Sequence, residues 1–240
     1  MSNEFPELDN IEILSLSDLE FLERGEIESI ENLKGHAPIM VVKIKGDGEA
    51  LFKPEGVEYD DFFTEKGAFR GELEFLVFLI DKILGTDMVP LTAKRKIADL
   101  NGVVQKFVSD AVLATKLNNW AKHASESEIL KATVVDYLIG AKDRSGFNFL
   151  VNTESGKIWL IDHDYYMMFF DEEHSTEDVI AKKAKILGIS KVPEDLIVGL
   201  SALPSALEQL ISEAEDPRIK TWLAEIKKRA LILLETKRIP

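Results

Sequence analysis

The sequence predicts an α+β protein with two lobes, an antiparallel sheet in the first lobe and mainly helices in the second. Three observations predict it: β-type runs surround one helical segment in the first half, a hairpin interrupts the second half, and helical periodicity fills the remainder of the chain. This order does not alternate strands and helices as a doubly wound sheet does. The lobes are expected to span residues 1–108 and 109–240.

The predicted N-lobe begins with a meander of short strands. Runs of β-forming residues are separated by turn segments that contain Gly and Pro, so neighbouring strands are expected to pair antiparallel. Residues 1–25 mix acidic and apolar residues without a clean period, which predicts an arm or a short helix packed on the meander. The three strands are expected at residues 27–33, 39–44 and 49–52.

One long helix comes after the meander. Apolar residues recur at helical spacing over residues 68–84, and Gly85 supplies a stop. Further strands are expected at residues 88–92 and 103–108. The pair Asn101-Gly102 between them suits a tight hairpin turn.

The predicted C-lobe carries a hairpin among helices. Ser125 and Glu128 form a capping-box pattern before a buried helix over residues 125–139. Strands are expected at residues 149–151 and 157–161. The chain beyond is expected to be helical, over residues 175–187, 193–214 and 217–237.

Composition restricts the class of function. The chain has 240 residues, 45% of them hydrophobic, and a formal net charge of −14. This charge argues against general binding to nucleic acid or to an anionic membrane, because both attract basic surfaces. There is no cysteine, so disulfides and thiolate metal sites are excluded. An acidic N-terminus without an apolar core is unlike a signal peptide, which favours a cytoplasmic protein.

A trio of polar residues around the second-half hairpin points to phosphoryl transfer. Asp143 follows the buried helix, Asn148 comes five residues later, and Asp162 comes fourteen residues after that, behind an apolar strand. One carboxylate near the acceptor hydroxyl, with an amide and a second carboxylate on magnesium, is a minimum set for transfer from a nucleotide triphosphate. Asp143 is therefore the candidate catalytic residue, and Asn148 and Asp162 are the candidate metal ligands.

Lys53, at the end of the third predicted strand, is the candidate lysine for a nucleotide phosphate. A lysine on a strand holds its ammonium group in a fixed position, and a carboxylate on the next helix would orient that ammonium group. Glu72 and Glu74 both lie on that helix, but residues two apart on a helix point to different sides. Glu74 is the expected partner.

Together these residues resemble the atypical kinases of the phosphatidylinositol 3-/4-kinase-like and HipA-like groups. The resemblance implies a bilobal protein-kinase-like fold, with ATP and Mg²⁺ as cofactors and a hydroxyl of a protein or small molecule as acceptor. It implies that adenine lies against a hinge that includes Gln105, Phe107 and Val108. The segments that carry it are Leu51-Phe-Lys-Pro54, Glu74 with Leu84-Gly85 and Val89-Pro90, Gln105-Lys-Phe-Val108, Asp136 to Asn148, and Ile161-Asp162-His163.

Other functions stay open at this stage. A catalytically weak or inactive pseudokinase would keep the fold and act as a nucleotide- or protein-binding module. A related fold that binds ATP differently would transfer AMP instead. His163-Asp164, with His123 or His174, is also the pattern of a helical metal phosphohydrolase, although the pair here follows a predicted strand.

Overall fold

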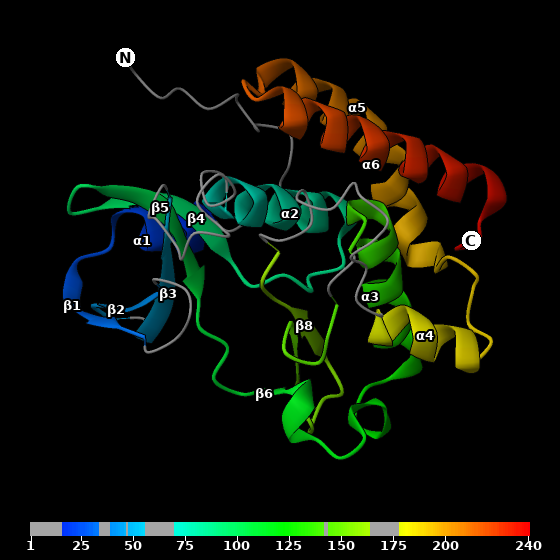
Figure 1. Ribbon diagram of the computed structural model, residues 1–240, viewed down its shortest axis with the longest axis horizontal. Helices are drawn as coiled ribbons and strands as arrows, with labels where there is room; N and C mark the ends of the chain where they lie inside the picture. The colour runs from blue at the N-terminus through cyan, green and yellow to red at the C-terminus, as the bar shows by residue number, and fades with distance from the viewer. Residues whose placement is uncertain (1–15, 34–38, 47, 56–69, 142–143, 164–177) are drawn as a thin grey trace, which may run out of the picture.

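The computed structural model describes residues 16–33, 39–46, 48–55, 70–141, 144–163 and 178–240. A sheet with a short helix forms one side of the molecule and a group of helices forms the other, with helix α2 between them (Figure 1). The predicted α+β class is therefore confirmed. No helix in the described parts of the chain is both long and apolar enough to cross a membrane.

The larger sheet has five antiparallel strands in the order β1-β2-β3-β5-β4. The predicted meander is present, although its connecting turn at residues 34–38 lies outside the described residues. Leu22 of helix α1 (Leu16–Arg24) packs with Val42, Phe52 and Val104 in a small apolar core on this sheet. The strands are β1 (Ile27–Asn32), β2 (Met40–Ile44), β3 (Gly48–Pro54), β4 (Thr92–Ile97) and β5 (Leu100–Lys106).

The hairpin between β4 and β5 corrects the prediction of a turn at Asn101-Gly102. Ile97 pairs with Leu100, so the turn lies at Ala98-Asp99, and Ala98 has φ 52°. Gly102 lies inside β5, where a Cβ atom would stand 2.4 Å from the carbonyl oxygen of Lys53. Glycine is needed there for close approach of two strands, not for a turn.

The predicted strand over residues 88–92 is also corrected, because sheet pairing begins only at Thr92. The amide of Met88 donates to the carboxylate of Asp81 (3.0 Å), and its carbonyl accepts from the amide of Leu160 (2.8 Å). Met88 and Val89 are buried, so their apolar character reflects a buried connection.

The chain beyond β5 also contains a three-stranded sheet in the order β6-β7-β8. Strands β7 and β8 form the predicted hairpin, and β6 was not foreseen. The elements are β6 (Val112–Leu113), β7 (Phe149–Val151), β8 (Ile158–Leu160), α3 (Glu126–Ile139), α4 (Val179–Ile186), α5 (Ile197–Glu213) and α6 (Pro217–Thr236), with short 3-10 helices at Ala114–Lys116, Trp120–Lys122 and Glu194–Leu196.

Only half of the predicted capping box forms at the start of α3. The hydroxyl of Ser125 accepts from the amide of Glu128 (3.1 Å), as expected for an N-cap. The carboxylate of Glu128 instead accepts from the amide of Ile158 on β8 (3.0 Å). The acid that the local pattern assigned to the helix therefore joins α3 to the second sheet.

Helix α2 (Arg70–Leu84) belongs to the larger apolar core of the molecule. Val77, Phe78 and Ile80 are fully buried in one cluster with residues of α3, α5, α6 and the β7–β8 hairpin. Gly199 of α5 lets the two helices approach, because a Cβ atom there would lie 2.5 Å from the carbonyl oxygen of Leu84. The helix thus packs both against the helical part and against strands β3, β4 and β5 of the larger sheet.

Candidate active site

The structure brings Lys53 of β3 and Glu74 of α2 together in the interior. The Lys53 ammonium group donates to Oε1 of Glu74, and the two side chains are 8% and 0% exposed. An unpaired charge at such depth would be costly, so each group offsets the other's loss of hydration. Glu74, the expected partner, is thus the glutamate that faces the lysine.

Three further donors converge on the Glu74 carboxylate. The amide of His163 donates to Oε1 (2.9 Å), the ring Nδ1 of His163 contacts Oε2 (3.0 Å), and the Gln105 amide donates to Oε2 (3.4 Å). Burial would raise the pKa of Glu74, but the charge of Lys53 and the hydrogen bonds from His163 outweigh it and hold that pKa well below its ordinary value. The site therefore keeps an ionised carboxylate in an apolar interior.

The imidazole of His163 also faces Glu74. Burial lowers the pKa of its imidazole, and a carboxylate can only accept, so Nδ1 carries the ring proton toward Glu74. Of the other members of the phosphohydrolase pattern, Asp164 and His174 lie outside the described residues, and His123 directly follows the short helix at Trp120–Lys122.

Asp162 stands beside this cluster in an unusual backbone conformation. Its φ is 59°, in the left-handed region that residues other than glycine seldom adopt. One carboxylate oxygen, Oδ1, lies 3.5 Å from Nζ of Lys53. That oxygen is buried and has no hydrogen-bond partner in the parts of the chain that the structure describes, although the side chain as a whole is 43% exposed. A buried oxygen of this kind is suited to a cation.

Asn148 is brought next to Asp162 by the β7–β8 hairpin. Its carbonyl accepts from the amide of Ile161 (3.2 Å), one residue before Asp162, and its side chain is largely buried. The end of α3, which leads into this loop, is held by α6: the Trp222 indole donates to the carbonyl of Ile139 (2.9 Å). Asp143, the predicted catalytic residue, lies outside the described residues between these anchored segments.

The three predicted hinge residues have different surroundings. The side chain of Gln105 is buried and donates to Thr92 (3.1 Å) as well as to Glu74, so it points to the interior cluster. Phe107 is 43% exposed, and its amide donates to the carbonyl of Glu49 (3.1 Å). Val108 is half-buried. Only Phe107 and Val108 are therefore placed to meet a ligand outside the interior.

Sequence reasoning missed the buried residues that hold the site residues in place through hydrogen bonds. His163 was weighed only as a metal ligand, and Thr92 was read as part of a strand. Asp136 and Arg144, both buried and paired with each other, were read only as parts of a motif. The signal for this pair was an acid in the middle of an otherwise apolar helix, which requires a buried partner.

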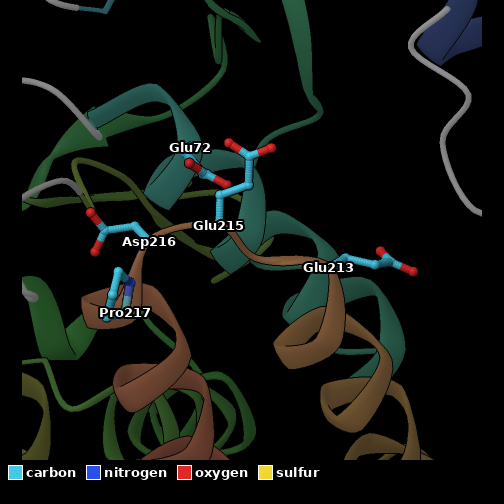
Figure 2. A pocket seen from close by; sticks show the side chains of 5 residues that line it. All are labelled: Glu72, Glu213, Glu215, Asp216 and Pro217. Carbon is cyan, nitrogen blue, oxygen red and sulfur yellow. The ribbon is translucent and has the colours of Figure 1, made fainter.

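Glu72 lies on a different side of α2 from Glu74. With Glu213, Glu215, Asp216 and Pro217 it lines a hollow of about 540 Å³ beside the turn between α5 and α6. Figure 2 shows the Glu72 and Glu215 side chains close together over this hollow, whereas Glu213 points away. Its four acidic side chains would repel a phosphate, so this hollow is not the nucleotide site.

The donor set suits magnesium that is shared with a nucleotide. Among the described residues no group of three or more His, Cys, Asp or Glu side chains could hold a metal ion. Magnesium commonly takes only one or two protein carboxylates and completes its shell with water and substrate phosphates. Asp162 and Asn148 supply oxygen ligands of the required kind.

Comparison with known proteins supports the architecture. Neither a protein-family model nor a curated protein matches this chain. The chain is similar to the crystal structure of the Golgi casein kinase, with 16% identity and a TM-score of 0.53 over 91% of this chain and 75% of that one. It also matches the open conformation of CtTel1, with 10% identity, a TM-score of 0.48, and coverage of 84% of this chain and 11% of that one. The protein has the bilobal protein-kinase-like fold that its sequence predicted.

Proposed function

We propose that the protein is an ATP- and magnesium-dependent phosphotransferase that acts on a hydroxyl group of a protein or small molecule. The observation that carries the proposal is the buried Lys53–Glu74 pair with Asp162 3.5 Å from the same lysine, within a kinase-like fold. In this proposal the lobes span residues 1–108 and 109–240, and the nucleotide lies between them.

Each residue of the cluster has a proposed role. Lys53 pairs with a nucleotide phosphate, and Glu74 holds the ammonium group in place before the nucleotide arrives. Asp162 and Asn148 hold the metal, which when bound neutralises charge on the transferred phosphoryl group. Phe107 and Val108 contact the base, while Gln105 does not touch the nucleotide and orients Glu74 through a hydrogen bond. Asp143 is proposed to orient the acceptor hydroxyl.

Two features favour a site prepared for this chemistry. The chain holds Asp162 in a left-handed conformation, and such uncommon conformations persist where surrounding contacts enforce them, often at functional sites. Its buried oxygen has no hydrogen-bond partner within the described residues, so a bound cation would satisfy it. The same cluster supports a nucleotide-binding pseudokinase equally at the level of binding, and only transfer separates the two.

Thermal unfolding tests the binding step. The protein is heated with ATP and magnesium, with each alone, and with neither, in the wild type, in Asp162→Asn and in Glu72→Gln as the control acid on the other side of α2. A ligand at about 100 times its Kd adds about 2.7 kcal/mol. This corresponds to a Tm rise of roughly 5–10 °C for a chain of this size. We expect the magnesium-dependent rise in the wild type and in Glu72→Gln, and its loss in Asp162→Asn.

Transfer is then followed with ATP labelled at the γ-phosphate, using the protein itself, casein and a panel of small alcohols as acceptors. Label incorporation that disappears in Asp143→Ala supports the phosphotransferase. A magnesium-dependent Tm rise without transfer to any acceptor would leave a nucleotide-binding module. The absence of any Tm rise at millimolar ATP would refute the proposal.

A further inference from the structure

Arg144 is the largest fully buried side chain among the described residues. It follows the proposed catalytic Asp143 in the sequence and precedes Asn148 by four residues. Its Nε and one terminal nitrogen, NH2, form a fork with the carboxylate of Asp136 on α3, at 2.8–3.1 Å. A guanidinium group matches a carboxylate in this two-pronged geometry, which lysine does not reproduce.

The other terminal nitrogen of Arg144 contacts the two segments that carry the proposed metal ligands. NH1 donates to the carbonyl oxygen of Asn148 and to that of Ile161 (3.0 Å). The first carbonyl belongs to one proposed ligand, and the second belongs to the peptide that joins Ile161 to Asp162. One planar group therefore holds both ligand segments at a fixed separation.

Asp162 is consequently fixed on both sides. The peptide before it is held by Arg144 through the Ile161 carbonyl, and the peptide after it is held by Glu74 through the His163 amide (2.9 Å). Two fixed peptide planes determine φ and ψ of the residue between them. The left-handed conformation of Asp162, with its Oδ1 3.5 Å from Nζ of Lys53, follows from these two anchors.

Buried ion pairs are often not needed for the stability of a fold. Both side chains are almost completely buried, at 0% exposure for Arg144 and 1% for Asp136. Replacing a buried ion pair by apolar side chains of similar volume is often neutral or stabilising. What an apolar pair cannot do is donate hydrogen bonds to two backbone carbonyls.

We propose that Arg144, oriented by Asp136, is a positioning residue that sets the separation and direction of the metal ligands Asn148 and Asp162. This inference rests on the proposed function, because it assigns Arg144 a role toward the metal of that site. Outer contacts of this kind typically change metal affinity 10–100-fold when they are removed.

The test measures metal affinity without turnover. Binding of Mn²⁺, an EPR-visible substitute for magnesium, is titrated in the presence of a saturating non-hydrolysable ATP analogue, and binding of the same analogue is measured without metal. The variants are Arg144→Lys and the apolar double variant Asp136→Leu/Arg144→Met. Arg218→Lys is the matched control, because Arg218 forms a similar but exposed fork with Asp216 (3.0–3.1 Å).

We expect both variants at Arg144 to weaken Mn²⁺ binding at least 10-fold, with the metal-free analogue bound within about 3-fold of the wild type. Arg218→Lys should leave both affinities unchanged. The double variant should also unfold in one cooperative transition, which shows that it folds and separates positioning from folding.

Three results would overturn the inference: wild-type Mn²⁺ affinity in a folded Arg144 variant, equal weakening of metal-bound and metal-free nucleotide, or failure of both variants to fold. The last would assign the pair to folding itself. If the wild type binds no Mn²⁺ with the analogue, the proposed function fails instead, and the wild-type titration alone reveals this.

Discussion

Replacing Lys53 by Met tests the buried charge cluster directly, because it removes the cation and keeps a side chain of similar length. Glu74 would then be an ionised carboxylate at 0% exposure with hydrogen bonds from His163 and Gln105 but no counter-charge. Removing one partner of a buried pair costs about 3–5 kcal/mol. Because those donors remain, we expect about 3 kcal/mol, or a Tm lower by roughly 6–12 °C.

The assay is urea unfolding at neutral pH without nucleotide, so the result does not depend on any activity. Lys45→Met is the matched control, because Lys45 pairs with Glu26 at 2.8 Å with both side chains more than 60% exposed. Such a surface pair is worth about 0–1 kcal/mol. Adding Glu74→Gln to Lys53→Met should restore much of the stability. Equal losses in Lys53→Met and Lys45→Met would refute the reasoning.

Three further predictions concern pH and packing. The pKa of Glu74 lies below its ordinary 4.5, so the stabilisation from its ionised form is complete above pH 4.5 and is lost as the pH falls through the folded pKa. Lys53→Met removes the main cause of this low pKa. It should therefore move acid unfolding, followed by circular dichroism, to higher pH. Burial raises the pKa of Asp81 from 3.8 to about 6, so the free energy of unfolding of the wild type decreases as the pH rises through this range. The free energy of unfolding of Asp81→Asn, measured by urea titration, should therefore rise by on the order of 3 kcal/mol relative to that of the wild type between about pH 4 and pH 8. A pH-independent difference would contradict this. Gly199→Ala should lower the free energy of unfolding by about 1–3 kcal/mol despite the higher helix propensity of Ala, because its Cβ meets the Leu84 carbonyl; an unchanged urea midpoint would show that α2 and α5 adjust freely.

Local pattern predicted most of the elements but not the close contacts between them. The helix before Gly85 and the hairpin after Asn148 were foreseen because their periodicity and turn residues are local properties. The predicted turn at Asn101-Gly102 was wrong because Gly102 is required by the close approach of the neighbouring strand, a contact that no local sequence pattern shows. The run at residues 88–92 was misread for a similar reason, since burial in a connection and burial in a strand select the same residue types.

The candidate site was foreseen where a residue acts through its own chemistry. Lys53, Glu74 and Asp162 lie together in the structure, and helical spacing indicated that only one of Glu72 and Glu74 could face the lysine. His163 and Arg144 were not foreseen as supports, because their roles depend on partners that are distant in sequence. The proposed catalytic role of Asp143 stays a prediction.

The attachment of α2 to the helical part has a consequence for motion. Its apolar face is shared with α3 and α5, whereas Lys53 belongs to the larger sheet, which has its own small core. A movement of that sheet relative to α2 would have to change the packing of α2 on β3, β4 and β5, including the contact of Lys94 with the Phe75 ring, as well as the polar contacts to Glu74. Because the Lys53–Glu74 pair joins β3 to α2, its presence would report whether the sheet keeps its position on the helix.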